Sequence, residues 1–209
     1  MIMMYLQTKK RETMTDNFDL FKEYIETNFP DFDKRSDSYF TVEIVRRGKD
    51  NPDLPAANYH FKTYYINYIS DIDKFKDEII KVCDLLKMRA YITVNRKSYH
   101  QVTLNTSAEY SRRIALHDYK KPYSIFEHCS GVYLDKSDKR WVVDIDDNQD
   151  PEDYVSIISP EKIILRVPTR SGVHLITRPF RRDKFFEECE KNGLPEIKIT
   201  QLSLLYENV

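Results

Sequence analysis

Residues 141–147 read WVVDIDD, and residues 170–176 read RSGVHLI. The first stretch has the pattern of a β-strand, in which residues two apart point to the same face, so Asp144 and Asp146 project together while the apolar residues between them turn away. Two adjacent carboxylates repel each other unless a cation or solvent stabilises them. Magnesium and manganese prefer carboxylate oxygens and keep waters or substrate phosphates as their remaining ligands, so this pair predicts a metal site.

An acidic turn in solvent is the alternative interpretation of these residues. The segment 147–153, which reads DNQDPED, is typical of such a loop and would explain Asp147 and the acids after it. It explains Asp144 less well, because a strand interior disfavours aspartate and burial of an unpaired charge is costly. We therefore predict that Asp144 and Asp146 are the metal ligands.

His174 follows a turn, PTRSG at residues 168–172, that is rich in hydrogen-bond donors. An isolated histidine in a strand is most often half-buried and bonded to the backbone. Here the Arg170 guanidinium, the Ser171 hydroxyl and the Gly172 amide offer donors of the kind that an anionic phosphate needs. Chemistry alone leaves both interpretations of Ser171 and His174 open, nucleotide binding and a structural role.

The rest of the chain interleaves segments of helical and strand periodicity. Strands 38–47 and 59–69 indicate a hairpin with a long loop, and residues 117–135 are expected to be irregular. This order predicts an α+β fold with mixed or antiparallel sheets flanked by helices. We expect one domain over 1–209, with an N-terminal half, 1–115, and a half carrying both motifs, 116–209. The other expected elements are helices at 16–29, 71–87 and 184–192, a weakly helical segment at 99–114, and strands at 88–94, 140–146, 163–168, 172–177 and 197–206.

Composition restricts the possible classes of protein. The 209 residues, 41% of them hydrophobic, are enough for a packed core. The 33 Lys and Arg residues against 34 Asp and Glu leave a net charge of -1, so any polyanion must be bound by local basic patches. No apolar run approaches the roughly 18 residues that span a bilayer, so we expect no membrane partner.

Two further features concern location and cofactors. The apolar N-terminus lacks a charged leading region and a small-residue cleavage site, which predicts a cytoplasmic protein. The three cysteines have no metal-ligand spacing and are expected to be reduced and structural. Neither G-x-G-x-x-G nor G-K-[ST] occurs, which excludes a Rossmann or P-loop phosphate site.

An apolar strand ending in D-x-D, followed by a strand with Ser171 and His174 at its start, resembles the D-x-D and S-x-H motifs of the archaeo-eukaryotic primase superfamily, which includes primase-polymerases, although here two residues separate Ser171 from His174. The order of the motifs matches. Residues 89–98, 141–147, 171–180 and 202–206 are also similar to phage-associated proteins related to that superfamily, so the resemblance covers the chain from about residue 38 onward. It implies a primase-polymerase-like fold with an RRM-like catalytic half.

The resemblance also implies a function, a metal-dependent nucleotidyltransferase that adds nucleotides to a primer or a starting strand. Its partners would be nucleotides, a DNA or RNA template and a helicase or other replication proteins, in a phage or mobile element within the bacterial cytoplasm. Asp144 and Asp146 would hold Mg²⁺ or Mn²⁺. The residues expected to bind the triphosphate are Arg170, Ser171 and His174. Further phosphate or nucleic-acid contacts are expected from Arg89, Arg96 and Lys97, which as strand-end cations are alternatively only solvated, and from Arg178, which belongs to a basic cluster around residues 179–180.

One part of the superfamily pattern is missing, an apolar residue followed by an acid on a later strand. Ile199 is followed by Thr200, whereas Glu196 precedes the expected strand and Glu207 lies near its end. Either acid serves as the third ligand, or the ligand is lost and Thr200 marks its place. Loss would leave a nucleotide- or nucleic-acid-binding module with weak or no polymerase activity. A metal-dependent nuclease is a further alternative with the same carboxylates.

Overall fold

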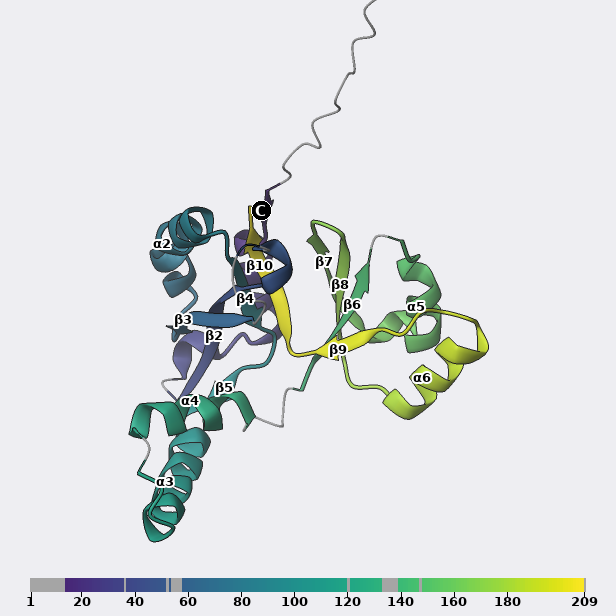
Figure 1. Ribbon diagram of the computed structural model, residues 1–209. Coiled ribbons are helices and arrows are strands. Elements are labelled where there is room, and N and C mark those ends of the chain that lie inside the picture. The colour runs from purple at the N-terminus through teal and green to yellow at the C-terminus, as the bar shows by residue number, and fades with distance from the viewer. Residues whose placement is uncertain are drawn as a thin grey trace, which may run out of the picture.

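The computed structural model describes residues 14–208 except 36, 52, 54–57, 120, 133–138 and 147, and without the side chains of Lys49 and Val132. Two sheets lie side by side (Figure 1). In the described residues every strand pairing is antiparallel, which confirms the expected α+β class. The first sheet has six strands in the order β1 (Thr15–Asp16), β10 (Leu202–Glu207), β4 (Arg89–Thr93), β2 (Ser38–Arg46) and β3 (Tyr59–Ile66), with β5 (Lys97–Ser98) paired to β2. The second has four, in the order β7 (Ile163–Thr169), β8 (Gly172–Thr177), β6 (Trp141–Asp146) and β9 (Lys198–Thr200).

Helices pack against both sheets (Figure 1). The first sheet packs Val42 and Ile92 against α1 (Phe18–Asn28) and α2 (Ser70–Leu86) in one apolar core. The second packs Val143 and Leu175 against α5 (Pro151–Ile158) and α6 (Arg182–Lys191) in another. Short 3-10 helices complete these layers: η1 (Phe32–Lys34), η2 (Gly48–Asp50) and η3 (Pro160–Lys162).

Strand β6 contributes to both cores by its alternation. Val142 is buried in the first core and Val143 in the second, so successive side chains of this strand serve different layers. Asp144 and Asp146 lie two and four residues after Val142, so they are on the same face of the strand as Val142. Their side chains therefore lie on the face of the second sheet that is turned toward the first sheet.

The chain passes from the second sheet to the first at residues 200–202. Strand β9 pairs with β6, and β10 then pairs with β4, so the C-terminal strand belongs to the first sheet. The boundary between halves expected at 115/116 therefore does not separate the two sheets. The crossover places β9 and β10 between the two halves, where both can contribute to a site.

Two helices differ from the sequence expectation. Helix α4 (Pro122–Val132) occupies a region expected to be irregular, and it packs with α3 (Tyr99–Ala115) through a small core of Val102, Ile125 and Cys129. Helix α5 begins within the segment interpreted as an acidic loop, because the Asp150 side chain accepts a hydrogen bond from the Glu152 amide and Pro151 suits the first turn. The expectation of an irregular region at 117–135 was wrong, and α5 was not predicted, because tertiary packing and a cap decide these helices.

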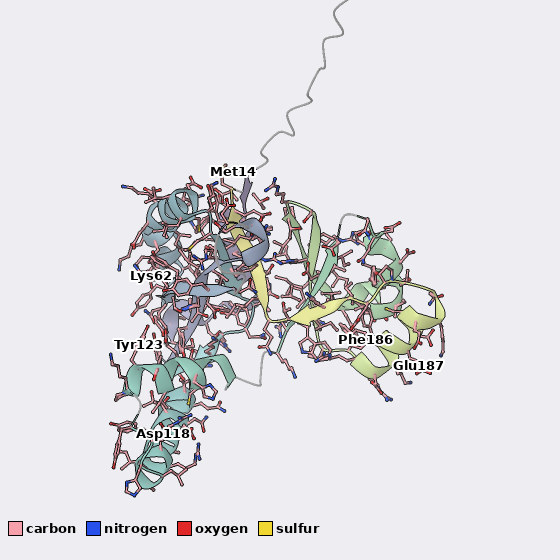
Figure 2. All side chains as sticks on the ribbon, viewed as in Figure 1. Met14, Lys62, Asp118, Tyr123, Phe186 and Glu187 are labelled. Carbon is pink, nitrogen blue, oxygen red and sulfur yellow. The ribbon has the colours of Figure 1, made fainter. Side chains whose placement is uncertain are left out.

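The expectations for the hairpin at 38–69 and for the cysteines are confirmed. The hairpin of β2 and β3 forms. All three cysteines are buried and free. None of the helices in the described part of the chain is long and apolar enough to cross a membrane. Figure 2 shows Asp118, between α3 and α4, and Tyr123, on α4, far from Glu187 on α6.

Candidate functional site

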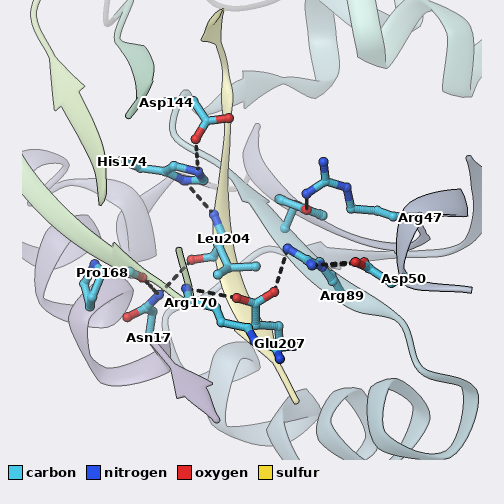
Figure 3. A network of polar contacts seen from close by, with 11 residues as sticks. Asn17, Arg47, Asp50, Arg89, Asp144, Pro168, Arg170, His174, Leu204 and Glu207 are labelled. Carbon is cyan, nitrogen blue, oxygen red and sulfur yellow. Dashed lines mark hydrogen bonds and ion pairs between the residues drawn. The ribbon is translucent and has the colours of Figure 1, made fainter. Parts of the chain in front are cut away.

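A cleft of about 400 Å³ lies between the two sheets, and we call it the intersheet cleft. The first sheet and the residue after β2 contribute Arg47, Arg89 and Tyr91 to its lining. Arg47 donates a hydrogen bond to the Tyr91 hydroxyl at 3.4 Å (Figure 3). This wall therefore brings the Arg47 guanidinium to the cleft.

Asp144 lies at the centre of the opposite wall. In the antiparallel register it stands directly between His174 of β8 and Lys198 of β9. Directly opposed residues of antiparallel strands project from the same face, so the carboxylate has an imidazole on one side and an ammonium group on the other. All three residues line the intersheet cleft.

His174 uses both ring nitrogens. Its Nε2 lies 3.2 Å from Asp144 Oδ1, and its Nδ1 accepts a hydrogen bond from the Leu204 amide at 3.2 Å (Figure 3). Nδ1 is also 3.0 Å from the Ser203 hydroxyl. Because an amide can only donate, the ring proton belongs on Nε2, where it points at Asp144. His174 thereby connects the carboxylate to β10 and fixes its orientation.

The charge on Asp144 is stabilised by its surroundings. The hydrogen bond from His174 lowers the pKa of this carboxyl most, burial acts in the opposite direction, and the positive charges of Arg47 and Lys198 lower it further. The Asp144 side chain is still 43% exposed. It is therefore an ionised carboxylate that remains accessible from the cleft.

The residues predicted from the sequence differ in whether they line the intersheet cleft. Asp146 and Ser171 are exposed and line the cleft, as do Asp144, His174 and Arg89. Arg170 is exposed and contributes its backbone amide to Glu207, at 3.0 Å. The remaining predicted contacts do not line this cleft: Arg96 pairs with Asp31, Lys97 lines a second cavity, and Arg178 is exposed just after β8.

Arg89 is the centre of a buried ionic group. It binds Asp50 with two hydrogen bonds, at 2.7 and 2.8 Å, and its Nη1 lies 2.6 Å from Glu207 Oε2 (Figure 3). Glu207 is fully buried and also accepts the Arg170 amide. Its carboxylate is thus committed to Arg89 and the turn, and of the two acids considered as a third ligand only Glu196 lines the cleft.

Asn17 fixes the two sheets to each other near this group. Its buried amide donates to the carbonyl oxygens of Pro168 and Leu204, both at 3.0 Å (Figure 3). Pro168 belongs to β7 and Leu204 to β10, so one side chain joins the edge of the second sheet to the first. The turn that carries Ser171 is therefore held in place on the cleft.

The residues present fit a metal ion only if a bound phosphate supplies further oxygen ligands. No group of three or more His, Cys, Asp or Glu side chains suited to a metal occurs in the described part of the chain. Two carboxylates on one face nevertheless fit Mg²⁺ or Mn²⁺, since Mg²⁺ is commonly held by one or two carboxylates together with substrate phosphates. The predicted metal thus stays a prediction, as an ion that arrives with a phosphate ligand.

Arg47 and Lys198 were not identified from the sequence. Arg47 follows a strand and gives no signal beyond its charge. Lys198 has alternating polar neighbours, Glu196 and Thr200, but only the pairing of β9 with β6 shows that it stands opposite Asp144. Polar alternation is typical of an exposed strand face, and only the strand register shows that Lys198 is paired with Asp144.

Comparison with protein-family models, with curated proteins and with solved structures found no match. The resemblance to primase-polymerases therefore stays a prediction. The geometry of the cleft is the basis for the function proposed below.

Lys97 is buried apart from the cleft, with 3% of its surface exposed, and its Nζ donates to the Thr41 hydroxyl at 3.3 Å. Burial lowers its pKa from 10.5 to about 8, although the nearby Glu43 carboxylate acts in the opposite direction. Below pH 8 both folded and unfolded chains carry the proton, so the burial penalty is fully present. As the pH rises from about 8 toward 10.5, only the folded chain has released it.

The free energy of unfolding should therefore gain about 1–3 kcal/mol from this group over that pH range. Urea denaturation of wild type and Lys97→Met at pH 7 and pH 9.5 measures the effect. We expect Lys97→Met to be the more stable protein at pH 7 and the difference to shrink at pH 9.5. An equal difference at both pH values would contradict a proton release from Lys97.

Proposed function

We propose that the intersheet cleft binds a nucleoside triphosphate with Mg²⁺ or Mn²⁺, and that the protein is a metal-dependent nucleotidyltransferase of the primase-polymerase type. One observation carries the proposal. Asp144 and Asp146 open on the same cleft as the cationic side chains of Arg47 and Lys198 and the hydroxyl of Ser171. Carboxylates for a cation and donors for phosphate oxygens thus lie together, and a cleft of about 400 Å³ falls within the range of small-ligand sites.

The roles follow from the chemistry of each group. Asp144 and Asp146 would hold the cation, which supplies charge neutralisation to the polyphosphate and acidifies a hydroxyl. Arg47, Lys198 and the Ser171 hydroxyl would bind phosphate oxygens. His174 keeps Asp144 oriented through the proton on Nε2, and a phosphate oxygen brought close by a bound nucleotide is a competing acceptor for that proton.

The resemblance of the motifs extends the proposal beyond the nucleotide. A DNA or RNA template and a primer or starting strand would be the macromolecular substrates, in replication of a phage or mobile element in a bacterial cytoplasm. A helicase or other replication proteins would be the protein partners. These partners rest on the motif order in the sequence.

A second candidate is a module of the same fold that binds a nucleotide or nucleic acid without transfer. Two observations favour it. Glu207 is committed to Arg89, and Lys198, a cation, stands opposite Asp144 on the strand next to it. A lysine there already compensates the carboxylate, which reduces the attraction of this site for a second metal ion.

The test measures binding and transfer separately. Binding of a fluorescent nucleotide analogue is followed by polarisation with and without Mg²⁺ or Mn²⁺, and transfer by extension of a labelled primer and by de novo synthesis. We expect Asp144→Asn and Asp146→Asn each to lower transfer by about 100-fold, because an amide oxygen carries no charge for the cation. The matched control is Asp153→Asn, an exposed acid of α5 outside the cleft, which should retain wild-type activity.

The outcomes separate the candidates. Metal-dependent binding with no transfer by wild type would select the binding module. Cleavage of DNA or RNA, with loss in the Asp144→Asn protein, would select a nuclease. Transfer that is unchanged in both cleft variants, or that falls equally in Asp153→Asn, would remove the assigned role of the two aspartates.

A further inference from the structure

A second cavity, of about 460 Å³, lies beside the intersheet cleft. Residues Thr200 and Leu202 at the crossover between the sheets line both. On the first sheet, Glu43 of the second cavity pairs directly with Tyr91 of the cleft. The two cavities are therefore adjacent sites on one face of the first sheet.

Three cations line this second cavity from different elements. Lys97 belongs to β5, Lys139 precedes β6, and Arg182 begins α6. Within the described residues none of the three forms an ion pair. Glu43 is the acidic residue on the same lining.

Some surface cations in the described part of the chain do have an acidic partner. Lys22 binds Asp73, and Arg181, the neighbour of Arg182, binds Asp183. Of these two adjacent arginines, Arg181 has a carboxylate partner, whereas Arg182, which lines the cavity, forms no ion pair within the described residues. The excess of positive charge is local, on a chain whose net charge is -1.

An indole completes the lining. The Lys139 ammonium lies 5.3 Å and the Arg182 guanidinium 5.8 Å from the ring of Trp141, and Phe180 meets that ring edge-on with centroids 4.8 Å apart. Trp141 is half-buried and lines the cavity. An aromatic ring among unpaired cations is the combination by which proteins bind single-stranded nucleic acid, with bases on rings and phosphates on cations.

Lys97 provides an independent indication of an anionic ligand. It is more than nine-tenths buried and lines the cavity, and its ammonium group, which has three donors, bonds to the Thr41 hydroxyl. A buried ammonium without a carboxylate bonded to it is costly. A phosphate in the cavity would offset that cost by supplying the missing acceptor.

We propose that the second cavity binds a single strand of DNA or RNA, with Lys97, Lys139 and Arg182 on its phosphates and Trp141 against a base. The choice of a nucleic-acid strand over other polyanions rests on the function proposed for the adjacent cleft. The observations on the three cations and on Trp141 do not depend on whether the intersheet cleft is catalytic. A strand in this cavity would lie directly beside a nucleotide in the cleft, across residues 200–202.

The chain has one tryptophan, so emission excited selectively at the indole, and not at the 15 tyrosines, reports on this cavity alone. Titration with a dodecamer of deoxythymidine or of uridine is expected to quench the emission, with an affinity that falls as salt rises. Arg182→Gln and Lys139→Gln should each weaken binding by about 5- to 10-fold. The matched control is Arg181→Gln, an exposed arginine one residue away that already has an acidic partner, and it should stay within about twofold of wild type.

Lys97→Met distinguishes ligand binding from a structural role. We expect it to raise the melting temperature, because it removes a buried charge, and to weaken oligonucleotide binding by at least 5-fold. A purely structural lysine would not produce this pair of opposite changes. Weaker binding together with a lower melting temperature would therefore overturn the role given to Lys97 in the cavity.

The same preparations are titrated with the fluorescent nucleotide analogue, so the two proposals fail separately. Oligonucleotide binding that quenches Trp141, without nucleotide binding, supports this inference and contradicts the function proposed for the cleft. Nucleotide binding without oligonucleotide binding overturns this inference and leaves the cleft proposal intact. Oligonucleotide binding with unchanged Trp141 emission, or an equal loss in Arg181→Gln and Arg182→Gln, also overturns it.

Discussion

Arg89→Met is expected to lower the free energy of unfolding by about 3–5 kcal/mol. The reason is the geometry of the group around it: Arg89 is buried and binds Asp50 and Glu207, and Glu207 has no exposed surface. Methionine keeps much of the side-chain volume and removes the charge. Two carboxylates are then left in a poorly solvated position without their cation, which is more costly than losing an exposed pair.

Urea denaturation at pH 7 measures this change. The control is Arg166→Met, which breaks the exposed pair of Arg166 with Glu152 and should cost less than about 1 kcal/mol. Adding Glu207→Gln to Arg89→Met should recover part of the loss, because it removes one of the uncompensated charges. Equal effects of the Arg89 and Arg166 substitutions would show that burial does not control the strength of this group.

The second large effect is expected from Gly172→Ala. Gly172 has φ 141°, and a Cβ atom there would lie 2.0 Å from the carbonyl oxygen of Ile145 and 2.9 Å from the carbonyl carbon of Asp146. Backbone strain and overpacking each cost about 1–3 kcal/mol, so we expect a loss of about 3 kcal/mol or more. The displaced atoms belong to the end of β6, so metal-dependent nucleotide binding should weaken as well.

Gly193→Ala is the control for this prediction. Gly193 also has a positive φ, 66°, but no atom lies within 4 Å of the position that a Cβ would take. We expect only the backbone penalty there, about 1 kcal/mol. Thermal denaturation of both variants, together with nucleotide polarisation, measures the two effects. Similar losses in the two proteins would contradict the close approach of Gly172 to β6.

Part of the candidate site could be predicted from sequence because it depends on one strand at a time. The alternation around Asp144 and Asp146 shows that they share a face, and the turn before His174 shows that Ser171 is near it. The structure brings all four to one cleft. Arg96 and Lys97 were predicted from charge near a strand end, and Arg178 from a local cluster of arginines. All three lie elsewhere, because local charge has no fixed neighbour until the sheets are assembled.

The amino-acid sequence by itself determined the α+β class, most element positions and the shared face of the two aspartates, because periodicity, caps and turn residues act over a few neighbours along the chain. Only the tertiary structure decided that Lys198 stands opposite Asp144, that Glu207 is bound to Arg89, and that Trp141 meets unpaired cations in a second cavity. These are pairings between residues far apart in the chain, and strand register and the packing of two sheets fix them. Local periodicity is the same in every register, so it carries no information about which distant residues meet.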